Sequence, residues 1–202
     1  MISSSIIEDI KPKCATGLDS FAYYYFDFGD IRKQDRRGLL SSLLIQLCTR
    51  SHRGYEILLN LFGKSANGLR QASEDDMVQC LKKVLELLGH GRVYIIVDAV
   101  DENPNAGMPS PREKVLRLIK DLVDLRHPNV YFCITSRPEV GIRTVLKPLA
   151  LHTVSLHDQG GQRDDITNYI KSVVGSDLIM KGWTPEDRQL VIVSLSEKAK
   201  GM

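Results

Sequence analysis

The stretch from Arg92 to Glu102, which reads RVYIIVDAVDE, constrains this chain more than any other part of its sequence. Its unbroken apolar run contains the β-branched residues Ile95, Ile96 and Val97 and ends abruptly at acids. Such a run is typical of a strand that is buried on both faces of a parallel sheet. The acids then stand at the carboxyl end of the strand, where open α/β sheets bind their ligands. The sequence therefore predicts an α/β fold with a candidate site at this end of the strand.

Asp98, the first of these acids, suits a magnesium ion held beside two phosphates. Magnesium prefers oxygen ligands and keeps several waters, so one or two carboxylates are enough to bind it next to a nucleotide. The alternative is that Asp98, Asp101 and Glu102 are loop acids that simply end a strand. The spacing is more particular, because Ala99 directly follows Asp98 where many ATPases place a catalytic glutamate, and the acidic pair comes one turn later.

Composition narrows the class of protein. A chain of 202 residues, 43% hydrophobic and 26% charged, predicts one globular α/β domain with a small helical appendage. A net charge of +2 is too small to indicate a nucleic acid partner. The four cysteines are isolated, which argues against a thiolate metal site and favours a reduced, cytoplasmic protein. No signal peptide or membrane-spanning run is visible, so no membrane partner is expected.

The other elements are predicted from apolar periodicity, helix caps and breakers. Strands are expected at 20–28, 93–98 and 129–136, with a shorter candidate at 151–156. Helices are expected at 1–10, ended by Pro12; around 39–47; at 73–88, opened by a capping box at Ser73; at 110–123, opened by a capping box at Ser110; at 164–174; and from Thr184 onward.

Gly63-Lys64-Ser65 looks at first like the end of a phosphate-binding loop. That loop needs Gly-x-x-x-x-Gly-Lys-Ser/Thr directly after a strand, so that backbone N–H groups and a helix N-terminus surround the phosphate. Here Leu58 takes the place of the first glycine, within an amphipathic stretch. We therefore do not assign a phosphate loop to these residues.

Several stretches together resemble one family. They are FDF at 26–28 followed by Lys33-Gln34, the leucine repeat at 39–47, VDAVDE at 97–102, TSRPE at 135–139 and the closing residues at 198–202. The acids resemble the Walker B motif of NACHT proteins, which are signal-transducing P-loop NTPases of the STAND class. Nearly the whole chain is similar to the nephrocystin-3-like N-terminal NTPase domain of fungi, which is often joined to ankyrin or WD repeats.

This resemblance implies roles for four residues. Asp98 would hold a magnesium ion bound to ATP or GTP, and Asp101 or Glu102 would orient the attacking water. Arg137 would be the sensor of the terminal phosphate, since its planar fork meets phosphate oxygens bidentately. The alternative for Arg137 is a salt bridge to Asp101 or Glu139. The resemblance also implies fused or bound repeat domains as partners, and a homo-oligomer on activation.

The chain departs from the family pattern at both ends. The first strand and the glycine-rich phosphate loop that follows it are missing, and residues 198–202 stand where relatives continue into a lid. We therefore expect a fragment, with an incomplete NTPase core at 1–158 and the start of a helical lid at 159–202. The missing strand lies inside the sheet in this superfamily, so its loss would leave the edge of strand 129–136 unpaired and separate it from 151–156.

Three functions remain open at this point. The first is a partial nucleotide-binding module of an NTPase switch, with weak or absent nucleotide binding by residues 1–202 alone. The second is a non-catalytic interaction or scaffold module with an NTPase-like fold. The third is an unrelated α/β enzyme that uses Ser136 or a cysteine as nucleophile, although no Gly-x-Ser-x-Gly elbow is present. The first requires Asp98, Glu102 and Arg137 to meet at one rim of the sheet.

Overall fold

The computed structural model describes residues 2–15, 17–49, 51–64, 71–155, 160–177 and 179–198. The chain divides into two compact units, Met1–Ala150 and Leu151–Met202. The predicted boundary between residues 158 and 159 stays a prediction. Within the described ranges, no helix is both long and apolar enough to cross a bilayer.

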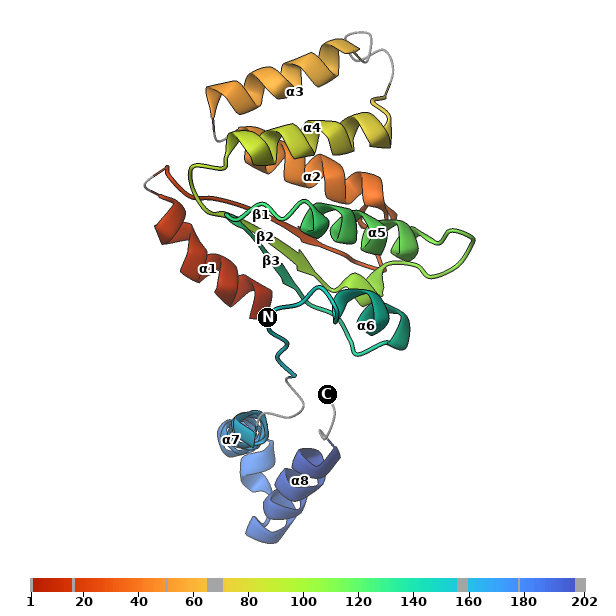
Figure 1. Ribbon diagram of the computed structural model, residues 1–202. Coiled ribbons are helices and arrows are strands. Elements are labelled where there is room, and N and C mark those ends of the chain that lie inside the picture. Colours follow the sequence, from red (N-terminus) through yellow and green to blue (C-terminus); the bar gives the residue numbers. More distant parts are fainter. Residues whose placement is uncertain are drawn as a thin grey trace. The chain divides into compact units, whose positions relative to one another are not determined.

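The first unit is built on a parallel sheet flanked by helices, which confirms the predicted α/β fold class (Figure 1). Its strands are β1 (Ser20–Tyr25), β2 (Val93–Asp98) and β3 (Val130–Ile134), in the order β1-β2-β3. Both pairings are parallel, and the register places Ile96 beside Tyr23 on one side and Cys133 on the other. The apolar run at residues 93–98 is therefore the central strand.

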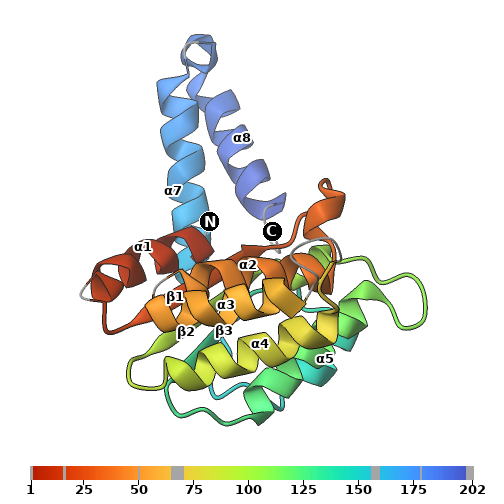
Figure 2. The same ribbon diagram turned by 90° about the horizontal axis from the view of Figure 1, so that it is seen from above.

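Helices cover the two faces of the sheet unequally (Figures 1 and 2). On one face lies α1 (Ile2–Cys14). On the other face lie α2 (Arg36–Cys48), α4 (Glu74–Leu87) and α5 (Pro111–Asp124), with α3 (His52–Lys64) packed outside α2 and α4. Short turns, η1 (Ile31–Lys33) and η2 (Val100–Glu102), and helix α6 (Val140–Leu146) complete the unit.

We call the face under α2, α4 and α5 the closed face. Alternate residues of β2, namely Val93, Ile95 and Val97, point into it and are almost fully buried. Its large core adds side chains from the three helices: Leu39, Leu40, Leu43, Leu44 and Leu47 from α2, Leu81, Val84 and Leu85 from α4, and Val115, Leu118, Ile119 and Leu122 from α5. The helical spacing of the leucines in α2 predicted that this helix packs against the sheet, and the structure confirms it.

We call the face under α1 the open face. Its buried hydrophobic residues within the described part of the chain are Ile7, Cys14, Phe21 and Ile96. Tyr23, Tyr25 and Tyr94 pack against them while remaining partly exposed. Tyr94 stacks on Tyr131 of β3, with ring centroids 5.6 Å apart. Among the described residues of the first unit, α1 is therefore the helix that covers this face, and partly exposed tyrosines lie beside it.

Side-chain caps fix the helix starts that the sequence predicted. The Ser110 hydroxyl accepts from the Glu113 N–H at 3.1 Å, and the Glu113 carboxylate accepts from the Ser110 N–H at 3.0 Å, which completes a capping box. The Ser73 hydroxyl likewise accepts from the Asp76 N–H at 3.1 Å. These caps satisfy N–H groups that have no partner within the helix.

The strands predicted at 20–28 and 129–136 are shorter in the structure, at Ser20–Tyr25 and Val130–Ile134. Two further predictions about elements were wrong. Helix α1 does not end before Pro12 but continues to Cys14. Pro12 removes one helical hydrogen bond, and burial of Cys14 against Ile7 and Phe21 compensates for that loss. Residues 151–155 form no strand, and Leu156 lies outside the described residues. A strand needs a paired edge, and β3 pairs with β2 alone in the described part of the chain.

The second unit, described by itself, contains α7 (Gly160–Ser176), the turn η3 (Met180–Gly182) and α8 (Pro185–Lys198). Helix α7 packs against α8 and against η3. The Thr184 hydroxyl caps α8 by accepting from the Asp187 N–H at 3.1 Å, as the sequence predicted. Among its described residues only Val174 is buried, so this unit has almost no core of its own.

Candidate functional site

The candidate site lies at the carboxyl ends of β2 and β3, where the chain turns away from the sheet. After Asp98 the backbone of Ala99 adopts a left-handed conformation, with φ 55° and ψ 48°. This turn directs the chain into η2, which carries Asp101 and Glu102. On the neighbouring strand, residues 135–139 lead from β3 to α6.

The Asp98 carboxylate is held by two hydroxyl groups. Its Oδ1 accepts hydrogen bonds from Ser3 Oγ, in the first turn of α1, and from Thr135 Oγ1, just past β3. Strand alternation puts Asp98 on the open face with Tyr94 and Ile96. Ser3 is buried, so this contact joins α1 to the end of the central strand.

Asp101 and Arg137 are in direct contact. The Asp101 carboxylate accepts from the Arg137 backbone N–H at 2.9 Å and lies 3.4 Å from Arg137 Nε. The Asp101 side chain is only 9% exposed, whereas that of Arg137 is 82% exposed. The salt bridge that the sequence left as an alternative is therefore present, and the predicted sensor role of Arg137 stays a prediction.

A polar hollow of about 480 Å³ opens beside this pair. Arg112 of α5 forms one wall of it. Its guanidinium donates to the backbone oxygen of Asp101 and, at 3.0 Å, to that of Asn103, and it pairs with the Glu139 carboxylate. Further lining residues are Phe28, Gln34, Glu102, Pro104, Asn105 and Arg137. Arg112 thus fixes η2 and the segment after β3 to the same helix.

The structure brings three of the four predicted site residues to one hollow. Asp101, Glu102 and Arg137 all line it, and the Glu102 carboxylate accepts from the Phe28 N–H at 3.3 Å. Asp98 stands at the same end of β2 but does not line the hollow, because its side chain projects from the open face. The carboxyl edge of the sheet is shared, while the side chains leave it in two directions.

Sequence reasoning missed Ser3, Thr135 and Arg112. Thr135 stood within the TSRPE stretch, and Arg112 stood in a capping box, but neither was given a contact to the site. Ser3 was assigned only to the first helix. Hydroxyl residues at a strand end and at a facing helix start are a signal that could have pointed to Asp98.

The atoms around Asp98 are of the chemical type that magnesium prefers as ligands. A carboxylate and two hydroxyls are all hard oxygen ligands. Within the described residues, no group of three or more His, Cys, Asp or Glu side chains is placed to hold a metal ion. One carboxylate with phosphates and waters is the usual magnesium arrangement at nucleotides, so this donor set fits that case better than a protein cage.

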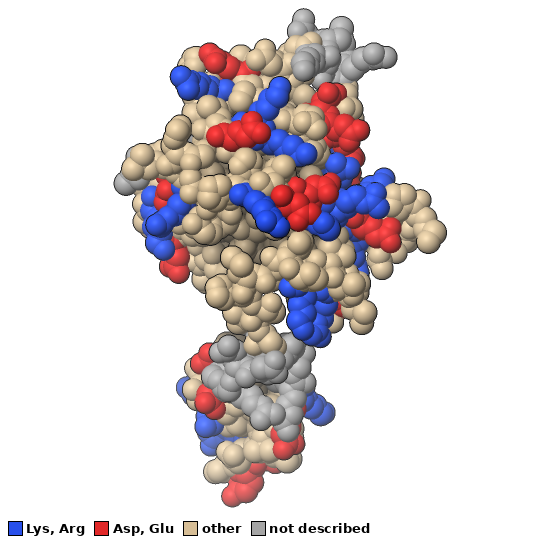
Figure 3. Space-filling view, in the orientation of Figure 1, with Lys and Arg blue, Asp and Glu red and all other residues tan. Residues whose placement is uncertain are grey.

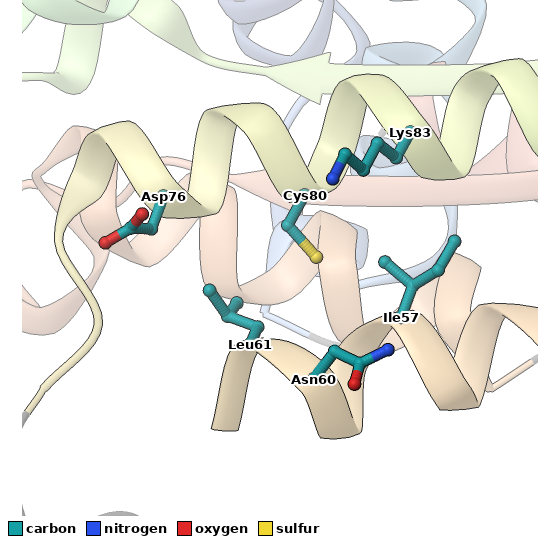
Figure 4. Close-up of a pocket in the computed structure, with 6 residues that line it drawn as sticks. All are labelled: Ile57, Asn60, Leu61, Asp76, Cys80 and Lys83. Atoms are coloured by element: carbon teal, nitrogen blue, oxygen red, sulfur yellow. The ribbon is translucent and has the colours of Figure 1, made fainter. Parts of the chain in front are cut away.

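A second cavity lies away from this site, between α3 and α4, and measures about 100 Å³ (Figure 4). Ile57, Leu61 and Cys80 give it a mainly apolar wall. Ligand pockets usually exceed about 300 Å³, so this space is a packing gap.

In the same helix layer, a hydrogen bond with Cys80 and burial raise the pKa of Cys48, which keeps its thiol protonated and a poor nucleophile.

Gly63 and Lys64 lie within helix α3, not between a strand and a helix. This placement confirms that they form no phosphate loop; Ser65 lies outside the described residues. Charges on the visible face of the first unit are of both signs and interspersed (Figure 3).

Comparison with known families gives a match that covers most of the chain. The model of the family described as "Nephrocystin 3, N-terminal" matches residues 1–137. This range contains all three strands and the site residues from Ser3 to Arg137. No curated protein matches the chain. No solved structure matches it either.

Proposed function

The chain belongs to the nephrocystin 3 N-terminal family, and on that premise we propose that it supplies the magnesium-binding and phosphate-sensing half of a nucleotide site. Together with a phosphate loop, this half would form a NACHT-type, signal-transducing NTPase switch of the P-loop class. The observation that supports this most is the placement of Asp98 at the end of the central strand, with Arg137 leaving the neighbouring strand.

In this proposal Asp98 carries the metal. A bound magnesium ion supplies charge neutralisation at the phosphates and orients them. The hydroxyls of Ser3 and Thr135 hold the Asp98 carboxylate in place and add oxygen atoms beside it. Asp98 and these hydroxyls come from three separate elements, so the proposed metal position depends on the folded sheet.

Arg137 is the phosphate sensor in this proposal. Its side chain is 82% exposed and pairs with Asp101 through Nε, so its guanidinium is open to solvent. A guanidinium that leaves Asp101 for a phosphate would free the Asp101 carboxylate to accept a proton from water. Glu102, in the same hollow, is the other candidate for orienting that water.

The phosphate contacts would come mainly from a glycine-rich loop, for which residues 1–202 offer no fitting sequence. Backbone N–H groups and a lysine of such a loop provide most of the affinity for the phosphates. We therefore expect residues 1–202 alone to bind Mg-ATP or Mg-GTP weakly. Binding should tighten when a strand and such a loop precede Met1.

Isothermal titration calorimetry with Mg-ATP and Mg-GTP tests this proposal on two proteins. One is residues 1–202, and the other is a longer form in which a strand and a glycine-rich loop precede Met1. Asp98→Asn should weaken binding by the longer form at least about tenfold, because a neutral amide is a poor magnesium ligand. Asp75→Asn, a change of the same kind at an exposed residue of α4, is the matched control. Tight binding by residues 1–202 that ignores Asp98→Asn would contradict the proposal.

A scaffold module with an NTPase-like fold is the second candidate. It is favoured by one observation, which is that Asp98, Asp101 and Glu102 all accept hydrogen bonds from the protein itself. Carboxylates engaged in this way can serve the fold alone. In that case Asp98→Asn would lower stability but leave nucleotide affinity unchanged.

A further inference from the structure

Thr135 binds four successive residues at the end of β2. Its backbone N–H donates to the Val97 oxygen at 3.0 Å, and its hydroxyl donates to the Asp98 carboxylate. The same hydroxyl oxygen accepts from the Ala99 N–H at 3.0 Å, and its backbone oxygen accepts from the Val100 N–H at 3.1 Å. One residue of β3's extension therefore fixes the backbone and the carboxylate where β2 turns into η2.

The turn that Thr135 holds is an unfavourable one. Ala99 has φ 55°, and a residue with a Cβ rarely adopts this left-handed conformation without support. The Ala99 carbonyl in turn accepts from the Glu102 N–H at 2.9 Å, which closes η2. The position of Asp101 and Glu102 thus follows from the conformation of Ala99.

We propose that Thr135 is a positioning residue that sets the Asp98 carboxylate and, through Ala99, the turn carrying Asp101 and Glu102 in one mutual arrangement. This inference rests on the proposed function for its consequence, which is that the Asp98 carboxylate on the open face and the acids of the hollow keep a fixed spacing around the carboxyl edge of the sheet. Its structural part stands on the four hydrogen bonds of Thr135.

The side-chain requirement is specific. The hydroxyl donates to one group and accepts from another at the same time, which only serine or threonine can do at this length. Valine has the same shape as threonine but neither bond. Thr135→Val therefore removes the two side-chain bonds and keeps the two backbone bonds, whereas Thr135→Ser keeps all four.

Amide hydrogen exchange on the full chain tests the structural part. In Thr135→Val, the Ala99 and Glu102 amides should exchange at least about tenfold faster, because one has lost its acceptor and the other depends on the Ala99 turn. The Phe26 amide, which donates to the Asp98 backbone oxygen at 3.1 Å, should keep its rate. Thr135→Ser should show the wild-type exchange rates at all three amides.

Thr144→Val is the matched control. The Thr144 hydroxyl makes a local bond to the Val140 oxygen on the exposed side of α6, so its loss should leave Ala99 unchanged. If Thr135→Val fails to fold, Thr135→Ala removes the same bonds without adding a methyl group at a half-buried position. Unchanged exchange at Ala99, or equal acceleration of Ala99, Glu102 and Phe26, would overturn the inference.

NMR line broadening by manganese distinguishes a failure of this inference from a failure of the proposed function. Manganese replaces magnesium and broadens NMR signals near its site. Broadening at Asp98 in the wild type that disappears in Thr135→Val and returns in Thr135→Ser supports both. Broadening that is the same in wild type and Thr135→Val overturns the inference and leaves the proposed function standing. Absence of broadening at Asp98 in the wild type overturns the proposed function, and the exchange rates alone then decide the role of Thr135.

Discussion

The two faces of the sheet differ in how completely they are covered. Three helices and a large apolar core bury the closed face, whereas α1 and four buried residues cover the open face within the described part of the chain. The candidate site lies where both faces reach the carboxyl edge: Asp98 projects from the open face, and Arg112 reaches the same edge from α5 on the closed face.

This difference separates stability from function. A fully buried leucine contributes about 1.5–3 kcal/mol relative to an exposed one, and α2 alone places five leucines in the closed face. The open face buries much less, and its partly exposed tyrosines can adjust at smaller cost. We infer that the closed face holds the sheet together while the open face leaves room for change around Asp98.

The largest expected effect is on the closed face. Leu43→Ala should lower the free energy of unfolding by about 3–5 kcal/mol, because Leu43 is almost fully buried in the core of the closed face and its truncation leaves a cavity. Urea unfolding followed by circular dichroism measures the change. A loss below about 1 kcal/mol would mean that the closed face is not the stabilising core.

A smaller effect is expected on the open face. Ile7→Ala should cost about 2 kcal/mol, the low end for such a change, because the tyrosines around it can close part of the cavity. The same urea experiment gives the value. Equal losses for Ile7→Ala and Leu43→Ala would remove the distinction between the two faces.

The smallest effect concerns Tyr24, whose ring lies in the closed face. Burial, with the nearby Asp35 and Asp30 carboxylates, raises the pKa of Tyr24 to about 12. Between pH 10 and about 12 the unfolded chain loses this proton before the folded chain does, so stability should fall as pH rises through that window. Below pH 10 both states keep the proton, and this contribution stays constant.

Tyr24→Phe removes the titrating hydroxyl and therefore isolates its contribution to the pH dependence of stability. The variant should lose less than about 1 kcal/mol at neutral pH, since the Tyr24 hydroxyl makes a long hydrogen bond of 3.5 Å to the Arg32 backbone oxygen. Its unfolding free energy should fall less steeply than that of the wild type between pH 10 and 12. Parallel curves for the two proteins would show that the Tyr24 hydroxyl is not buried.

Local patterns predicted the elements that depend on neighbours in sequence. The apolar run at 93–98 and the caps at Ser73 and Ser110 are examples. The end of α1 was missed because burial of Cys14 by distant residues outweighs the local effect of Pro12. Helix α6 was missed as well, being too short to show a clear apolar period.

In the candidate site, too, features that depend on local sequence could be predicted, whereas contacts between distant residues could not. The acids and Arg137 could be placed at one edge because parallel strands end together. The contacts of Asp98 with Ser3 and Thr135 could not, because those three residues are joined only by the folded sheet. Nor could the sequence decide between a sensor and a salt bridge for Arg137, since both use the same charge in the same place.

The most direct test of the central claim is manganese broadening with ATP present, read on the backbone amides of the full chain. This measurement detects metal bound even weakly, so it does not depend on a phosphate loop. We expect the amides around Asp98, Ala99 and Thr135 to broaden first, and the effect to vanish in Asp98→Asn. Broadening centred elsewhere, or the same broadening in Asp98→Asn, would contradict the assignment of Asp98 as the metal ligand.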